Sequence, residues 1–132
     1  MSPEKTKELL DKYPKLLERI SHFEHGDGWF SLLDNLFDKL NHITNIQFVQ
    51  IKEKFGSLRA YYTFKEYEDA RDNENDLLAD VIDIVISAAE EQSCTTCEDC
   101  GSTDNTTTGA TRYWIRTLCQ PCREQEYIRL GY

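Results

Sequence analysis

Two pairs of cysteines near the end of the chain have the types and spacing of metal ligands. Cys97 and Cys100 form one C-x₂-C motif, Cys119 and Cys122 form a second, and residues 101–118 separate them. This is the spacing of a zinc ribbon, in which four thiolates bind one tetrahedral Zn²⁺. Because four sulfurs close the coordination sphere and leave no position for a catalytic water, the sequence predicts a structural zinc ion.

A fifth cysteine, Cys94, leaves alternatives open. Cys94 and Cys97 also have C-x₂-C spacing, so Cys100 could be the unused thiol instead. Gly101 favours Cys97 and Cys100, because a residue without Cβ lets backbone amides turn toward the sulfurs. Disulfides are the other alternative, which the odd number of cysteines disfavours. If Cys94 is free, it could be a reactive thiol, but its Thr and Glu neighbours are not the cationic groups that activate cysteines.

Length and composition indicate one domain of ordinary size. The 132 residues are 39% hydrophobic, which is enough for a modest packed core. No apolar run approaches the roughly 20 residues that a membrane helix needs, and residues 1–8 lack the apolar stretch of an export signal. We therefore expect a protein of the cytoplasm with no membrane contact.

The negative charge is concentrated in one segment. Residues 66–93 contain ten acidic residues and a single basic one, Arg71, which matches the net charge of −9 of the whole chain. This balance disfavours an ordinary duplex-DNA binder, which needs clustered Lys and Arg. The acidic segment could instead bind a basic surface of a partner protein. The candidate partner-binding residues are Asp72, Glu74, Asp76 and Asp80, and a merely solvated acidic surface is the alternative.

The elements that carry these residues predict an α+β fold. Helical periodicity predicts a helix near residues 4–12 and a second one that starts at Pro14. A stronger amphipathic helix follows a turn at His25–Gly28. Its apolar stripe consists of Trp29, Leu32, Leu33, Leu36, Phe37, Leu40 and Ile43. Trp29 could alternatively be a ligand-binding aromatic residue.

A two-residue period over residues 46–65 predicts an antiparallel β-hairpin with its turn at Gly56. Lys52, Lys54 and Arg59 cluster near that turn, and with Tyr61 they could contact single-stranded nucleic acid. A long helix is expected at 76–91. Its predicted buried stripe consists of Leu77, Leu78, Val81, Ile82, Val85, Ile86 and Ala89.

The last part of the chain, residues 93–132, is predicted to be a zinc-ribbon lobe on an α+β body formed by residues 1–92. We expect a loop over 102–110, a strand over 112–118 and a short helix over 123–130. Arg112 and Arg116 on the strand are further candidates for nucleic-acid contacts.

Catalytic motifs are sparse. The three histidines, His22, His25 and His42, lack the spacing of a metalloprotease helix, and no nucleophile elbow, phosphate loop or dinucleotide fingerprint occurs. His22 and His25 flank Glu24, which leaves a second metal site or a small active site as an alternative to ordinary loop histidines. We therefore expect a protein that is not an enzyme.

Four motifs carry a resemblance over most of the chain: Tyr13–Pro14, FEHGDGWF at 23–30, VQIKEKFGSLR at 49–59 and TCEDCG at 96–101. In this order they resemble a group of small phage and prophage proteins without an assigned activity. The chain departs from that group at His25, where relatives have Cys, and at Cys122, where several have His. The resemblance implies a phage or prophage origin and a zinc-bound C-terminal lobe, but no mechanism.

These observations lead to two hypotheses about function. The first is a small phage-encoded interaction protein that binds a host protein in the host cytoplasm and inhibits a bacterial defence system. The second is a nucleic-acid-associated accessory factor that uses the basic residues of the hairpin and the ribbon. Loss of nucleic-acid affinity with rising salt would support the second.

Overall fold

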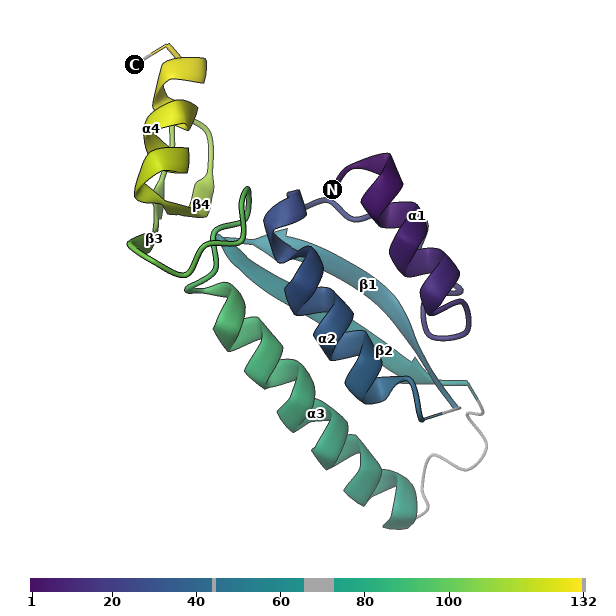
Figure 1. Cartoon of the computed structure of the whole chain (residues 1–132). Helices are drawn as coiled ribbons and strands as arrows, with labels where there is room; N and C mark the ends of the chain where they lie inside the picture. The colour runs from purple at the N-terminus through teal and green to yellow at the C-terminus, as the bar shows by residue number, and fades with distance from the viewer. Residues whose placement is uncertain (44, 66–72, 132) are drawn as a thin grey trace.

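The computed structural model describes residues 1–43, 45–65 and 73–131 and confirms the α+β class (Figure 1). The body contains α1 (Pro3–Lys12), a 3₁₀ turn η1 (Asp27–Trp29), α2 (Phe30–Leu40), β1 (Ile46–Lys54), β2 (Ser57–Phe64) and α3 (Asn73–Ser93). The C-terminal part contains β3 (Thr106–Ala110), β4 (Ile115–Cys119) and α4 (Gln120–Arg129). In the described part of the chain, no helix combines the length and apolar character needed to cross a bilayer.

The first helix is confirmed, but the second helix predicted at Pro14 is wrong. The Ser2 hydroxyl caps α1 by accepting a hydrogen bond from the Lys5 amide at 3.4 Å, and Pro3 occupies the first turn. Residues 14–19 form turns instead of a helix. The reason is a competing partner for the backbone, because the Leu16 carbonyl accepts a hydrogen bond from Phe48 of β1 at 2.9 Å.

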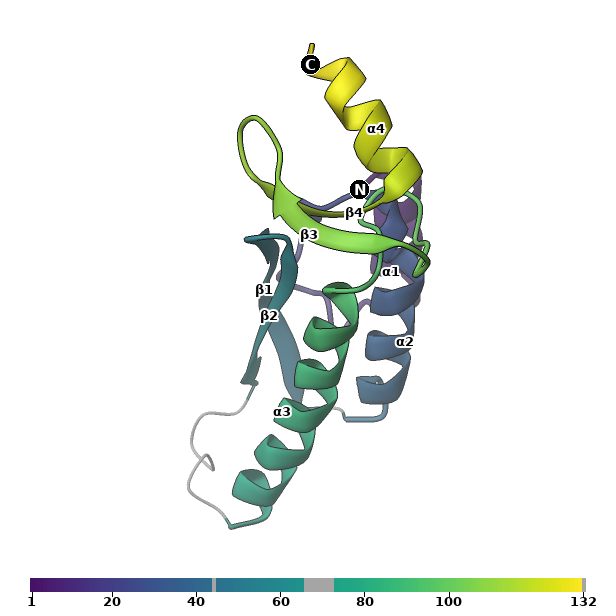
Figure 2. The ribbon, with the colours of Figure 1, turned by 90° about the vertical axis from the view of Figure 1, so that its left-hand side faces the viewer.

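The hairpin predicted at 46–65 is present. Strands β1 and β2 are antiparallel, with Lys54 opposite Ser57, so the loop between them has two residues, Phe55 and Gly56. Both have positive φ angles, of 54° and 84°, as the tight turns that match strand twist require. Figure 2 shows α2 and α3 on the same side of this hairpin. Between these elements lies the main core, which includes Trp29, Leu33, Phe37, Phe48, Leu58 and Ile82.

The long helix is present and extends beyond the predicted bounds of 76–91, but its predicted buried stripe is partly wrong. Ile82, Ile86 and Ala89 are buried. Leu77 and Val81 are instead 68% and 48% exposed. The apolar residues of α3 cover more of the helix than the face that packs on β2 and α2 can bury.

The C-terminal part forms its own small hairpin and helix. β3 pairs antiparallel with β4, from Thr106 opposite Cys119 to Ala110 opposite Ile115. The loop predicted over 102–110 is therefore partly a strand, in keeping with the β preference of its threonines. The helix begins at Gln120, earlier than predicted, with Pro121 in its first turn. A domain boundary near residue 92 stays a prediction.

Candidate metal centre

Four cysteine sulfurs converge in the C-terminal part of the chain. The Sγ atoms of Cys97, Cys100, Cys119 and Cys122 all lie within 4.8 Å of one another. The Cys100 and Cys119 sulfurs are 3.6 Å apart. Sulfurs on a tetrahedral Zn²⁺ with Zn–S bonds of about 2.3 Å are separated by about 3.8 Å, so the cluster has the dimensions of a single-ion site. It is the one group in the described residues that could hold a metal ion.

The structure decides between the alternatives for the cysteines. Cys94 is exposed, lies outside the cluster and directs its sulfur toward the Glu90 carbonyl at 3.6 Å. A site built from Cys94 and Cys97 with Cys100 unused is therefore not formed. All five cysteines are free thiols, so the disulfide alternative is not formed either.

Two local structures present the ligands. Cys97 and Cys100 lie in the turn that follows α3, which is closed by a hydrogen bond from the Gly101 amide to the Cys97 carbonyl at 2.9 Å. Gly101 has a φ of 83°, the left-handed conformation that glycine adopts at little cost. Cys119 ends β4, and Cys122 lies in the first turn of α4. The strand-to-helix junction thus brings the second pair to the first.

The thiols affect each other electrostatically. Burial raises the pKa of the Cys97 thiol, but hydrogen bonds from the backbone amides of Cys119, Cys100 and Asp99 outweigh burial and leave it below its ordinary value. Burial and the neighbouring thiols raise the pKa of Cys122 far above its ordinary value. Four thiolates cannot share this space without a compensating cation, and a divalent metal ion would supply that charge.

The glycine-rich turn of the body contacts the first cysteine pair directly. The Gly28 amide donates to the Glu98 carbonyl at 2.7 Å, and the indole Nε1 of Trp29 donates to the Thr96 carbonyl at 2.9 Å. A Cβ on Gly28 would lie 2.1 Å from the Cys97 carbonyl oxygen. Trp29 is fully buried, so it is a core residue and not a ligand-binding aromatic residue.

The tip of the first hairpin contacts the second hairpin. The Thr117 hydroxyl donates to the Gly56 carbonyl at 2.6 Å, and the Thr117 carbonyl accepts from the Glu98 amide at 3.0 Å. A Cβ on Gly56 would lie 2.8 Å from Thr108. In the sequence alone, the two glycine motifs indicate only turns. Their glycines were the available signal, because close backbone approach requires residues without side chains.

A buried ion network joins the elements around the cysteine cluster. Arg116, whose side chain is 11% exposed, donates from Nε to Glu98 at 2.8 Å and from a terminal nitrogen to Asp99 at 2.6 Å. Its other terminal nitrogen lies 3.2 Å from Glu126 of α4, which also accepts from Arg129. Burial lowers the pKa of Arg116, but the carboxylates of Glu98 and Asp99 outweigh burial and raise it. Burial raises the pKa of Glu98, although Arg116 opposes that shift.

The residues considered for nucleic-acid binding lie in two places. Lys52 and Arg59 are opposite each other on β1 and β2, and the Lys52 ammonium is 5.9 Å from the ring centre of Tyr61. Lys54, at the strand end, lies over Phe55 at 5.6 Å. The ribbon residues are in the second hairpin. Arg112 was predicted on a strand over 112–118, but β4 begins only at Ile115, so Arg112 lies in the loop after β3, where it donates to the Leu130 carbonyl at 2.9 Å. Arg116 belongs to the ion network described above.

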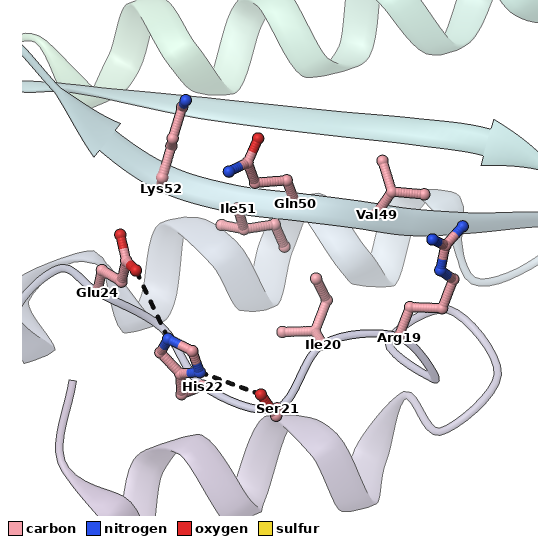
Figure 3. A pocket seen from close by; sticks show the side chains of 9 residues that line it. All are labelled: Arg19, Ile20, Ser21, His22, Glu24, Val49, Gln50, Ile51 and Lys52. Atoms are coloured by element: carbon pink, nitrogen blue, oxygen red, sulfur yellow. Dashed lines mark hydrogen bonds and ion pairs between the residues drawn. The ribbon is translucent and has the colours of Figure 1, made fainter.

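A small pocket lies between β1 and the segment that follows α1 (Figure 3). Its volume of about 160 Å³ is well below the roughly 300 Å³ at which small-molecule sites begin. His22 lies 3.6 Å from Glu24 and 3.0 Å from the Ser21 hydroxyl, but the His22 side chain is 70% exposed. His25 is instead buried beside Trp29, so the two histidines do not form a joint site.

The acidic candidates are placed as follows. Asp72 lies outside the described residues. Glu74 falls within α3, near its start. Asp76 and Asp80 are exposed on α3.

Comparison with known proteins adds nothing to these observations. No family model, no curated protein and no solved structure matches the chain. The resemblance to phage and prophage proteins therefore stays a prediction, and function has to be argued from the site and the surface.

Proposed function

We propose that the chain is a non-enzymatic, zinc-braced protein that binds a partner protein. The observation that carries this is the closed set of four cysteine sulfurs, all within 4.8 Å of one another. A metal ion with four thiolate ligands has no open position for water or substrate, so it contributes to folding and not to chemistry. Its role is to hold the turn after α3, β4 and α4 together.

Zinc is the metal that these ligands suit best. Tetrahedral sites with four sulfurs select zinc or iron, and zinc is the usual ion in paired C-x₂-C motifs with this spacing. Metal analysis of the purified protein is expected to find one zinc ion per chain. Cys97→Ser should lose the ion, whereas Cys94→Ser should keep it. Retention by both variants, or iron in place of zinc, would contradict this assignment.

The surface available for a partner is on α3. Asp76 and Asp80 are exposed there, and bound zinc with four thiolates would add about two further negative charges to the chain. A partner with a basic surface is therefore the natural complement. The resemblance to phage and prophage proteins suggests a bacterial host protein as this partner, bound in the host cytoplasm, and inhibition of a defence system as the consequence.

Affinity capture from a bacterial lysate tests the role of this surface. The variant Asp76→Asn/Asp80→Asn is compared with wild type and with Asp38→Asn/Asp104→Asn, which removes the same charge from exposed positions elsewhere. Wild type and the control should capture the same protein, and the α3 variant should lose it. Equal capture by all three proteins, or capture of nothing by wild type, would contradict the proposal.

Nucleic-acid binding remains the second candidate, since Lys52, Arg59 and Tyr61 lie close together on the first hairpin. Titration with labelled single-stranded and duplex DNA and RNA at rising salt tests it. Binding that weakens steeply with salt and is lost in Lys52→Gln/Arg59→Gln would favour this candidate. Absence of binding at low salt would eliminate it.

A further inference from the structure

Helix α3 has a second apolar face besides the one that packs on the body. Ile82 and Ile86 are buried, whereas Leu77, Val81 and Ile84 are 68%, 48% and 69% exposed. These three exposed residues have the spacing i, i+4 and i+7, so they lie along one side of the helix. Ala88, also exposed, continues the same row by one turn. We call these four residues the outer stripe.

One side of α3 is left uncovered by the other described helices and strands. In Figure 1 the hairpin and α2 lie on one side of α3, and no other described helix or strand covers its opposite side. Figure 2, which is viewed from that direction, shows α3 in front of the body. A contiguous row of large exposed apolar side chains is unfavourable in water and typically marks an interaction surface.

A row of carboxylates runs beside the outer stripe. Asp76, Asp80, Asp83 and Glu91 are exposed, and their spacing of four, three and eight residues places them along one edge of the same helix. Asp83 also accepts a hydrogen bond from the Tyr62 hydroxyl at 3.2 Å. Residues 73–93 include no Lys, Arg or His. The helix therefore combines an apolar row with charge of a single sign.

We propose that the outer stripe binds an amphipathic helix of a partner protein, with an apolar row facing Leu77, Val81 and Ile84 and with Lys or Arg along one edge. This deepens the proposed function and depends on it. A helix in a groove or along a helix face is recognised by apolar anchors at i, i+4 and i+7 spacing, and complementary charge fixes its direction. A second copy of α3 is disfavoured, because residues 73–93 contain acidic but no basic side chains, so two copies would repel each other and neither would supply the cations.

Designed peptides test the proposal directly. The first probe is a helical peptide as long as α3, 21 residues, with leucines in one stripe and lysines along its edge. The second keeps the leucines and replaces the lysines with glutamates, and the third keeps the composition of the first but scatters the leucines. Fluorescence anisotropy of labelled peptides should show that the first peptide binds. Each of the other two should bind at least about tenfold more weakly than the first. Higher salt should weaken binding of the first peptide.

The variant Leu77→Ser/Ile84→Ser should reduce affinity for the lysine peptide by about tenfold or more. Ile128→Ser is the matched control, because Ile128 is a similarly exposed isoleucine, at 76%, but lies on α4. The control should bind as wild type does. Circular dichroism and zinc content verify that each variant is folded.

Three results with the peptides would overturn the proposal. They are equal binding of the scattered peptide, equal loss of binding in both variants, and no binding of the lysine peptide. A wild-type dimer in analytical ultracentrifugation that dissociates in Leu77→Ser/Ile84→Ser would overturn it in favour of a second copy. The proposed function can survive such a failure. If lysate capture still depends on Asp76 and Asp80 but not on Leu77 and Ile84, the partner binds by charge alone.

Discussion

At the scale of single residues, Arg116 is a candidate for nucleic-acid contacts in the sequence, but in the structure it forms ion pairs within the protein. Three carboxylates surround its guanidinium, and two of them, Glu98 and Glu126, are themselves buried. A buried ion pair adds little net stability, but removal of one partner leaves an uncompensated charge in a site shielded from water. Arg116 therefore holds β4 against the cysteine turn and α4.

Substitution of Arg116 tests this role. Arg116→Met is expected to lower the free energy of unfolding by about 3 kcal/mol, because Glu98 would stay buried without its cation. Arg112→Met, at an exposed position in the loop between β3 and β4, should cost about 1 kcal/mol or less. Urea unfolding followed by circular dichroism measures both. Equal effects of the two substitutions would mean that the network does not contribute specifically.

His25 should make stability depend on pH. Burial against Phe23 and Trp29 lowers the pKa of His25 from 6.5 to about 4, while its Nδ1–H donates to the Gly26 carbonyl. Between pH 6.5 and about pH 4, His25 is protonated in the unfolded chain but stays neutral in the folded chain. The free energy of unfolding therefore decreases as pH falls through this window. The full effect is about 3 kcal/mol.

The measurement is urea unfolding of wild type and His25→Phe at several values between neutral pH and about pH 5. Thiolate protonation at the metal site affects both proteins, so the difference between their pH slopes isolates His25. Wild type should lose more stability than the variant as pH falls. Identical slopes would show that His25 is not buried in its neutral form.

At the scale of elements, the connection between body and C-terminal lobe depends on close backbone contacts. The turn at η1 and the tip of the β1–β2 hairpin each bring a glycine against the lobe. Gly28 meets the backbone of Cys97 and Glu98, and Gly56 meets Thr108 and Thr117. The contact at Gly28 couples the geometry of the metal site to the body. If the turn with Cys97 and Cys100 changed its conformation, it would no longer fit against η1.

An added methyl group tests the first contact. Gly28→Ala would place a Cβ 2.1 Å from the Cys97 carbonyl oxygen, so the backbone must move and the Gly28–Glu98 hydrogen bond is strained. We expect a loss of about 3 kcal/mol in unfolding free energy and about tenfold weaker zinc binding. Gly109→Ala, whose Cβ would approach no closer than 3.8 Å to Arg123, should change neither quantity. Competition with a chromophoric chelator measures zinc affinity.

At the scale of the whole molecule, the two cores differ greatly in size. The body has a large core drawn from its helices and the first hairpin. Among its described residues, the hydrophobic cluster of the C-terminal lobe consists of only three buried side chains, Cys97, Leu118 and Cys119, with Cys122 packed alongside. So little apolar burial cannot offset the conformational entropy that the lobe loses on folding. Metal binding therefore has to supply the remaining stabilising free energy.

Removal of zinc is therefore expected to unfold the two parts unequally. Hydrogen exchange with mass spectrometry, with and without a chelator, should show loss of protection over β3, β4 and α4. Residues in α2 and the first hairpin should keep most of their protection. Uniform loss of protection throughout the chain would mean that body and lobe unfold as a single unit.

Local signals determined much of this protein. The C-x₂-C spacing and Gly101 favoured Cys97, Cys100, Cys119 and Cys122, but they left Cys94 open as an alternative ligand, because Cys94 and Cys97 have the same spacing. Periodicity placed α2, the hairpin and α3, since apolar repeats reflect one buried face. The same periodicity wrongly predicted a helix after Pro14. The backbone there is hydrogen-bonded to β1, and this contact with a distant segment leaves no local sequence pattern.

Only the tertiary structure decided which residues are available at the surface. Arg116 becomes internal because carboxylates from the cysteine turn and α4 converge on it, and Leu77 and Val81 stay exposed because the body covers one side of α3. Gly28 meets the cysteine motif and Gly56 meets the second hairpin, although these segments are far apart in sequence. Contacts between distant segments depend on how the elements pack together, and no spacing within a single segment can reveal them.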